Sequence, residues 1–130
     1  MRVIDHETTA KEEWRAGVMT RMRVSAINGG SQLCIFEQWC TTDRGAPTHV
    51  HAVEEVLSVL EGQAEIWIEE DRKPVSAGQS VVIPAGRRHG FKNIGTSILH
   101  VQATLAAPIF EATFEDGDAT RRRWVPPYRG

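Results

Sequence analysis

Residues 49–55 read HVHAVEE and residues 84–93 read PAGRRHGFKN, and these two stretches decide the fold of the chain. Each contains histidine together with the turn residues that would place it. Neutral imidazole and ionised carboxylate groups are ligands for divalent transition metals. The two stretches therefore predict one metal site with four candidate ligands: His49, His51, Glu55 and His89.

The spacing of these residues agrees with convergence on one point. His49 and His51 are two residues apart, so their side chains share a face of an extended strand. His89 comes from a distant segment, after a turn that Pro84 and Gly86 fix. A single histidine on an apolar face is more often an ordinary core residue than a ligand. Here both stretches carry their turn residues in order, which favours the metal site.

Short apolar runs separated by Gly, Pro, Asn and Asp make up most of the chain. Regular turn signals between such runs are typical of an all-β sandwich or barrel, and the strongest of them is Asn28-Gly29-Gly30. Almost no helix is expected; residues 7–15 could form one or two short turns. The expected strands span residues 18–27, 32–41, 55–60, 63–69, 79–83, 90–93, 97–105 and 109–114.

Length and composition indicate one ordinary globular domain. The chain has 130 residues, of which 41% are hydrophobic and 25% charged. The formal net charge of -2 gives no basic field for nucleic acid. No apolar run approaches the roughly 20 residues of a membrane span, and the N-terminal residues do not resemble a signal peptide. We therefore expect a cytoplasmic protein with no nucleic-acid or membrane partner.

The cysteines and the basic clusters have ordinary interpretations. Cys34 and Cys40 lie about 20 Å apart on one expected strand, whereas a disulfide needs Cα atoms within about 7 Å. Both are therefore expected to be free, buried thiols. Arg87 and Arg88 could attract an anionic substrate, although a solvated turn is the more common outcome. The three arginines at 121–123 are expected to form a solvated run.

The two stretches resemble the two sequence motifs of the cupin superfamily. The first resembles its motif from the histidines onward, and the second has every position of its motif filled. The matching residues are His49-x-His51-x3-Glu55-x6-Gly62 and Gly78-x5-Pro84-x-Gly86-x2-His89-x3-Asn93.

One departure from the first cupin motif is visible. The leading glycine of the family usually stands six residues before the first histidine, where this chain has Asp43. Gly45 is four residues before it. The departure concerns the approach loop and leaves the ligand positions untouched.

The resemblance implies an antiparallel double-stranded β-helix, a jelly-roll β-barrel, of the small single-domain cupin-2 type. It implies that the four candidate ligands coordinate one metal inside the barrel. The metals of the family include iron, manganese, nickel, zinc, copper and cobalt, and imidazole and carboxylate suit all of them. Cupins of this size commonly form homodimers. The expected divisions are an N-terminal segment at 1–17, the barrel at 18–114 and a C-terminal tail at 115–130.

Side chains near the metal would form a pocket. Two apolar residues share strand parity with Glu55, and an aromatic residue follows His89 by two positions. The strand at 97–105 has a polar face that contacts a substrate if it points into the barrel, and has no role there if it points outward. The candidate pocket residues are Leu57, Val59, Phe91, Gln102 and His100.

Such a site is compatible with several functions. Four protein ligands leave positions open on an octahedral metal, so a small oxygenated metabolite can bind beside them. The expected activity is a metal-dependent enzyme, either a dioxygenase-type oxidoreductase or an isomerase or lyase. The alternative is a non-catalytic module that binds or senses a metal or small ligand. A purely structural barrel is less favoured, because it has no need of four convergent ligands.

Overall fold

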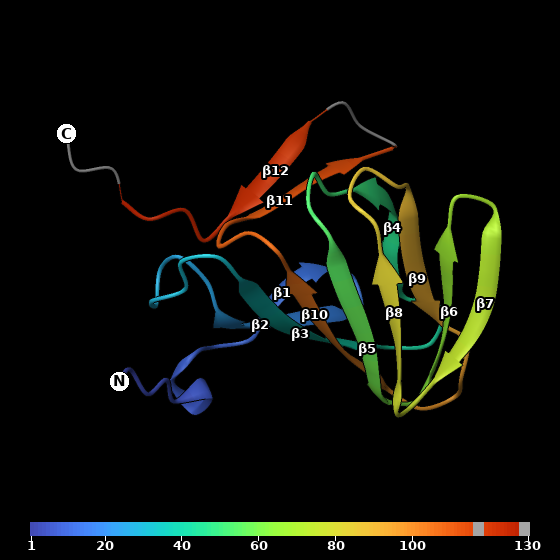
Figure 1. Cartoon of the computed structure of the whole chain (residues 1–130). Coiled ribbons are helices and arrows are strands. Elements are labelled where there is room, and N and C mark those ends of the chain that lie inside the picture. Colours follow the sequence, from blue (N-terminus) through green and yellow to red (C-terminus); the bar gives the residue numbers. More distant parts are fainter. Residues whose placement is uncertain (116–118, 128–130) are drawn as a thin grey trace.

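The protein is described from a computed structural model, which describes residues 1–115 and 119–127. Within these residues the chain forms two six-stranded antiparallel sheets and a single short 3-10 helix at His6–Thr8. The two sheets pack face to face (Figure 1). The predicted all-β jelly-roll fold is confirmed.

The first sheet has the strand order β1-β2-β3-β10-β5-β8. β1, β2 and β3 are consecutive in the chain, whereas β10 lies between β3 and β5 and so brings strands from distant parts of the sequence together. Its strands are β1 (Glu12–Arg15), β2 (Val18–Val24), β3 (Cys34–Cys40), β10 (Leu99–Leu105), β5 (Glu55–Glu61) and β8 (Gln79–Ile83).

The second sheet has the order β12-β11-β4-β9-β6-β7. The hairpin of β6 and β7 forms one edge, and β11 and β12 lie together at the other edge, at the top of Figure 1. Its strands are β12 (Thr120–Arg123), β11 (Phe110–Phe114), β4 (Gly45–Val50), β9 (His89–Asn93), β6 (Gln63–Ile68) and β7 (Asp71–Ser76).

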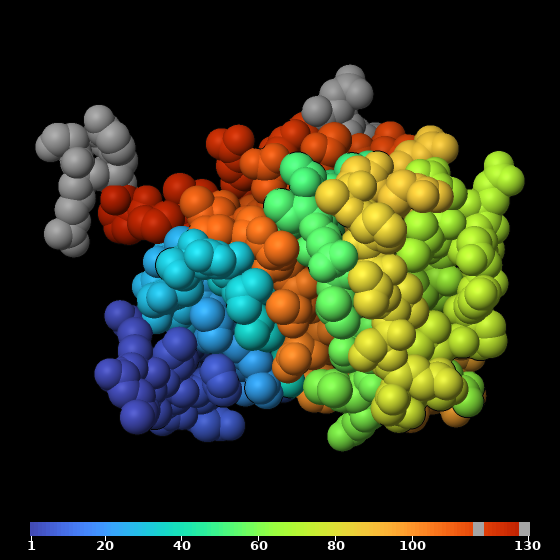
Figure 2. Space-filling view, in the orientation of Figure 1, coloured from blue at the N-terminus to red at the C-terminus, as the bar shows by residue number. Residues whose placement is uncertain are grey.

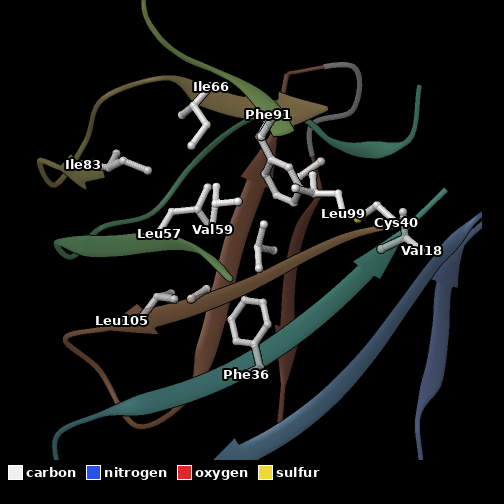
Figure 3. Close-up of a cluster of buried hydrophobic side chains, with 14 of the residues drawn as sticks. Val18, Phe36, Cys40, Leu57, Val59, Ile66, Ile83, Phe91, Leu99 and Leu105 are labelled. Carbon is white, nitrogen blue, oxygen red and sulfur yellow. The ribbon is translucent and has the colours of Figure 1, made fainter. Parts of the chain in front are cut away.

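The core lies between the two sheets. Alternate residues of each strand point inward, as a period of two requires. In β10, Leu99, Val101 and Ala103 are buried while the residues between them are half-buried. Figure 3 shows side chains of both sheets pointing toward one another, with Phe91 above Val59. Cys34 and Cys40 belong to this core as free thiols, as predicted.

Besides β1, three strands were not expected from the sequence, and two of these three contain proline. Pro47 lies in β4, where the pairing with β9 shifts register, and Pro74 lies in β7, which is an edge strand. Bulges and edges are the places where a sheet tolerates proline, since its missing N–H breaks no regular ladder there. The third, β12, consists of polar residues paired only to β11.

The N-terminal prediction is wrong in one respect. Residues 7–15 do not form a helix; only His6–Thr8 is helical, and the segment then pairs with β2 as β1. The blue N-terminal residues lie at the lower left of Figure 2. A Cβ added at Gly29, in the loop after β2, would lie 2.8 Å from Cδ of Arg2, so the N-terminal segment packs close to this loop. β1 and β12 are edge strands of the two sheets, so both sheets extend past residues 18–114.

Two further findings concern the ends of the chain. Of the tail at 115–130, residues 116–118 and 128–130 lie outside the described residues. Among the rest of the chain, no helix has the length and apolar composition that a membrane span requires.

Candidate metal centre

The four candidate ligands come from three strands and meet at one end of the space between the sheets. His49 is on β4, and His51 follows that strand directly. His89 begins β9, where it pairs with His49 across the two strands. Glu55 begins β5 in the opposite sheet. The sequence motifs therefore supply three ligands from one sheet and the carboxylate from the other.

Their ligand atoms form a compact cluster. One atom from each of the four side chains lies within 4.8 Å of the others. Oε1 of Glu55 is 2.9 Å from Nε2 of His89 and 3.4 Å from Nε2 of His51. All four residues are buried, with exposed fractions between 2% and 6%. The structure thus brings together the complete set that the sequence predicts.

Each imidazole ring is held by a backbone carbonyl. Nδ1 of His49 lies 2.7 Å from the carbonyl oxygen of Pro47, and Nδ1 of His89 lies 2.9 Å from the carbonyl oxygen of Arg87. In His51 the partner is the carbonyl oxygen of Glu111 on β11, at 2.6 Å. A carbonyl only accepts, so Nδ1 carries the proton and donates in each ring. In the neutral ring, Nε2 then has a free lone pair directed at the cluster.

Burial and mutual contact set the ionisation of the cluster. Burial, with the neighbouring His89 and His51, lowers the pKa of His49 to about 3. Burial acts to lower the pKa of His51 as well, but the hydrogen bond with Glu55 outweighs it, and this pKa is raised. Burial acts to raise the pKa of Glu55, but hydrogen bonds with His51 and His89 hold it well below its usual range. At neutral pH the cluster therefore offers a carboxylate and a neutral His49.

This donor set fits a divalent transition metal. Three Nε2 atoms and one carboxylate oxygen are the usual ligands of such ions. The carbonyl partners of the three Nδ1 atoms are the kind of support that fixes ring orientation at metal sites. The four side chains could therefore hold one metal ion.

A narrow pocket leads to the cluster. Its volume is about 20 Å³, which is room for about one water molecule. A larger ligand therefore requires the lining side chains to move. Besides the four candidate ligands, the pocket is lined by Trp14, Arg15, Phe36, Gln38, Ala46, Leu57, Phe91, Ala103, Phe110 and Phe114.

Three of the predicted pocket residues point into the space between the sheets, and two point away from it. Leu57 and Phe91 line the pocket, and Val59 points into the core further along β5. The placement of Gln102 and His100 at the pocket is wrong, because both lie on the outer face of β10. The inner face of that strand carries the apolar side chains, since burying them excludes more apolar surface from water.

His100 belongs to a separate cluster on the outer face of the first sheet. Its Nε2 lies 2.9 Å from Oε1 of Glu37, and its ring stacks on Trp39 at 4.7 Å between centroids. Arg23 lies 2.7 Å from the same carboxylate. Burial acts to raise the pKa of Glu37, but Arg23 and His100 together lower it. His100 therefore has a structural partner distant from the metal cluster.

Several pocket residues were not predicted from the sequence. Trp14 and Phe110 are in contact, 4.9 Å between ring centroids, and join β1 to β11 across the pocket mouth. Gln38 is buried and donates from Nε2 to Oγ1 of Thr20 at 3.0 Å. The alternation of the strand predicts that Gln38 and Phe36 share one face, but it does not show whether that face points inward.

The arginines before His89 are paired at the surface. Nε of Arg87 lies 3.3 Å from Oε1 of Glu69, and Nε of Arg88 lies 3.1 Å from its Oε2. Arg88 also contacts Glu115 at 3.3 Å. Carboxylates thus balance both guanidinium groups, and they form a surface ion cluster.

Comparison with known families agrees with the fold and the cluster. Residues 41–105 match the family model of the Cupin domain, which begins before His49 and ends after His89. The chain belongs to the cupin superfamily.

Individual similar proteins cover different shares of the chain. Polyketide synthase CurC of Streptomyces cyaneus is 29% identical over 99 residues, which are 72% of this chain and 62% of that protein. The chain thus spans less than two thirds of that relative. The polyketide cyclase RemF from Streptomyces resistomycificus has a TM-score of 0.72 at 18% identity, covering 97% of this chain and 87% of that one. An RmlC-like cupin from Shewanella frigidimarina has a TM-score of 0.68 at 22% identity, covering 78% and 86%.

Proposed function

We propose that this cupin binds one divalent transition metal through His49, His51, Glu55 and His89 and acts as an enzyme on a small, oxygen-rich molecule. One observation carries the proposal: the four ligand atoms lie within 4.8 Å of one another at the base of a pocket with aromatic walls. Burying a carboxylate among three imidazoles costs free energy unless a metal ion or protons on the imidazoles compensate its negative charge.

The walls of the pocket favour a flat, apolar body that carries ketone or hydroxyl oxygens. Phe36, Phe91 and Phe110 offer ring faces and edges to such a body. Gln38, fixed by its bond to Thr20, is a polar group that can hydrogen-bond a ligand oxygen. A metal held by His49, His51, Glu55 and His89 would supply Lewis acidity to a ligand with two neighbouring oxygens, such as a diketone.

We further propose that the substrate is a polyketone chain and that the reaction closes a ring. Two similar proteins carry names from polyketide chemistry, and the RemF likeness covers 97% of this chain. A bound divalent metal supplies Lewis acidity, which lowers the pKa of a C–H group between two ketones. The proton leaves that carbon, the electron pair forms a bond to another carbonyl carbon, and the oxygen there takes up this proton as a hydroxyl group. The second proton of the same carbon then leaves with that hydroxyl as water, and the electron pair of the broken C–H bond forms a C=C bond.

The residues of this chain would orient and shield that reaction. Apart from the four metal-cluster residues, Arg15 is the only titratable side chain among the described residues that line the pocket. This lining supports a reaction in which the metal, rather than a separate acid or base, activates the substrate. The aromatic side chains would exclude water from the closing ring.

A polyketone thioester incubated with metal-loaded protein tests the proposal. We expect a product lighter by the mass of water, with no consumption of dissolved oxygen. His51→Ala should give no product, while His100→Ala, which changes a histidine outside the site, should retain activity.

Other outcomes would redirect the assignment. A product heavier by oxygen, with oxygen uptake, would replace cyclisation with dioxygenase-type chemistry. Metal-dependent binding without turnover would replace the enzyme with a binding module. Unchanged activity in His51→Ala would refute the metal site.

A further inference from the structure

A second cavity lies beside the metal pocket and shares part of its wall. Its volume is about 210 Å³, an order of magnitude more than the inner pocket. The two share the four lining residues Trp14, Arg15, Phe110 and Phe114. A ligand that reaches the metal cluster by this route therefore passes through the outer cavity.

The register of the second sheet turns two arginines toward this cavity. Arg121 pairs with Ala112, and Arg123 pairs with Phe110. Directly opposite residues of paired strands project from the same face, and Ala112 and Phe110 are buried on the inward face. Arg121 and Arg123 therefore take the side facing the barrel, and both line the cavity. Arg122 has the opposite parity and bonds to Glu111 at 2.7 Å.

The cavity is rich in positive charge. Its lining among the described residues contains three arginines and no carboxylate. Oε2 of Glu12 lies 3.8 Å from Nη1 of Arg123, and Glu12 does not line the cavity. The guanidinium of Arg123 lies 4.1 Å from the ring of Trp14, which holds it over an aromatic wall.

We propose that the outer cavity binds an anionic oxygen group, a carboxylate or a phosphate, at the end of a substrate whose apolar body extends into the metal pocket. This rests on the proposed function and specifies its substrate class. Guanidinium groups bind both kinds of anion through paired N–H donors. A polyketide substrate could present either group, as a free acid or as the phosphate of a carrier arm.

Inward charges on an edge strand have another known use. They prevent the edge from pairing with another sheet, and β12 is an edge strand. That role would need no ligand, and it does not require the arginines to line a cavity that shares a wall with the metal pocket. The two roles differ in what the arginines do to ligand affinity.

Calorimetric titration of metal-loaded protein with matched ligands separates these roles. The probes are 4-(3-oxobutanoyl)benzoate, its uncharged methyl ester, and the analogue with an aryl phosphate. In each the diketone can reach the metal while only the distal group differs. We expect the two anions to bind at least about ten-fold tighter than the ester, which is the effect of one charge-assisted hydrogen bond. The tighter of the two anions identifies the source of the group.

The variants compare the two faces of β12, because Arg121 and Arg123 line the cavity and Arg122 does not. Arg121→Gln with Arg123→Gln should remove most of the difference between anions and ester and leave the affinity for the ester unchanged. Arg122→Gln is the matched control, since it removes one positive charge from the same strand on the other face, and it should keep the difference. Lysine at positions 121 and 123 should retain part of it.

Failure of this inference is distinguishable from failure of the proposed function. Equal affinities for acid and ester in the unmodified protein, or a difference that survives Arg121→Gln with Arg123→Gln, would overturn the anion site while metal-dependent diketone binding stands. Benzoate and phenyl phosphate, which carry no diketone, test whether the anion site exists even if the proposed function is wrong. If diketones do not bind but these anions do, and the double variant loses them, the cavity is an anion site and the proposed function is wrong.

Discussion

The three histidines of the cluster differ in their neighbours but share one arrangement. In His49 and His89, Nδ1 bonds to the carbonyl oxygen two residues earlier in the chain, so the motif itself supplies the support. His51 depends instead on Glu111, sixty residues away. The ligand identities were readable from the spacing of residues 49–55 and 84–93. The support for His51 was not, because it depends on how β11 packs.

Loss of one ring should greatly weaken metal binding. For His89→Ala we expect at least about a 100-fold lower affinity, since even altering a partner of a ligand costs 10- to 100-fold. Competition against a chelator of known affinity measures this. His100→Ala is the control, because His100 is bonded to Glu37 on the outer face. A metal affinity in His89→Ala equal to that of the control would show that His89 is not a ligand.

Metal affinity should fall with acid. A proton on His51 competes with the metal, and the pKa of His51 is raised above its ordinary 6.5. Affinity should therefore decrease as the pH falls through that raised value, by at least about ten-fold per pH unit below it. His49, with a pKa of about 3, stays neutral in this range. Titrations between pH 8 and pH 5, as a rough window, check this; a flat profile would contradict it.

At the scale of elements, the close approach of β4 to β9 positions two of the ligands. A Cβ added at Gly45 would meet the carbonyl oxygen of Phe91 and lie 2.8 Å from Cα of Lys92. Both of these atoms belong to the backbone, so the clash could not be relieved by rotation of a neighbouring side chain. The glycine thus lets the strands that carry His49 and His89 pair directly. From the sequence alone, Gly45 was predicted only to belong to the approach loop.

Gly45→Ala should therefore destabilise the protein and disturb the site. We expect a loss of about 1–3 kcal/mol in the free energy of unfolding, as for overpacking elsewhere, together with weaker metal binding. Chemical denaturation and chelator competition measure the two effects. Gly95→Ala is the control, because the nearest atom to its added Cβ is at 3.5 Å, an ordinary contact. Equal stability of the two variants would contradict this role for Gly45.

The sequence did not predict which face of a strand points into the core. Alternation showed that His100 and Gln102 share one face of β10 and Leu99 and Val101 the other. It did not show which face points inward, because a period of two is symmetric. Burial of the apolar face decided it. Likewise β4 and β7 contain Pro47 and Pro74, which argue against strands unless the bulge and the edge are known.

At the scale of the whole molecule, a bound metal would join the two sheets. Glu55 belongs to the first sheet and the three histidines to the second or its margin. An ion that binds the folded state alone should stabilise it by about 2.7 kcal/mol at a hundred-fold excess over the dissociation constant. For a chain of this length the unfolding midpoint should rise by about 10 °C. Thermal scans with and without metal measure this; His51→Ala should show no rise.

The overall architecture of the chain was largely predictable from its sequence. Short apolar runs and turn signals indicated an all-β fold, and the two motifs indicated the cupin superfamily, both of which are confirmed. The edge strands β1 and β12 were missed because their sequences are polar or charged. The homodimer and the cytoplasmic location stay predictions. Analytical ultracentrifugation would check the first.

The most direct test of the account is the metal content of the protein itself. The chain should be purified without a polyhistidine tag or chelator and analysed for iron, manganese, nickel, zinc, copper and cobalt, beside His51→Ala and His89→Ala. We predict about one ion per chain in the unmodified protein and little in either variant. No metal after reconstitution with these ions, or equal metal in all three proteins, would contradict the assignment of His49, His51, Glu55 and His89 as a metal centre.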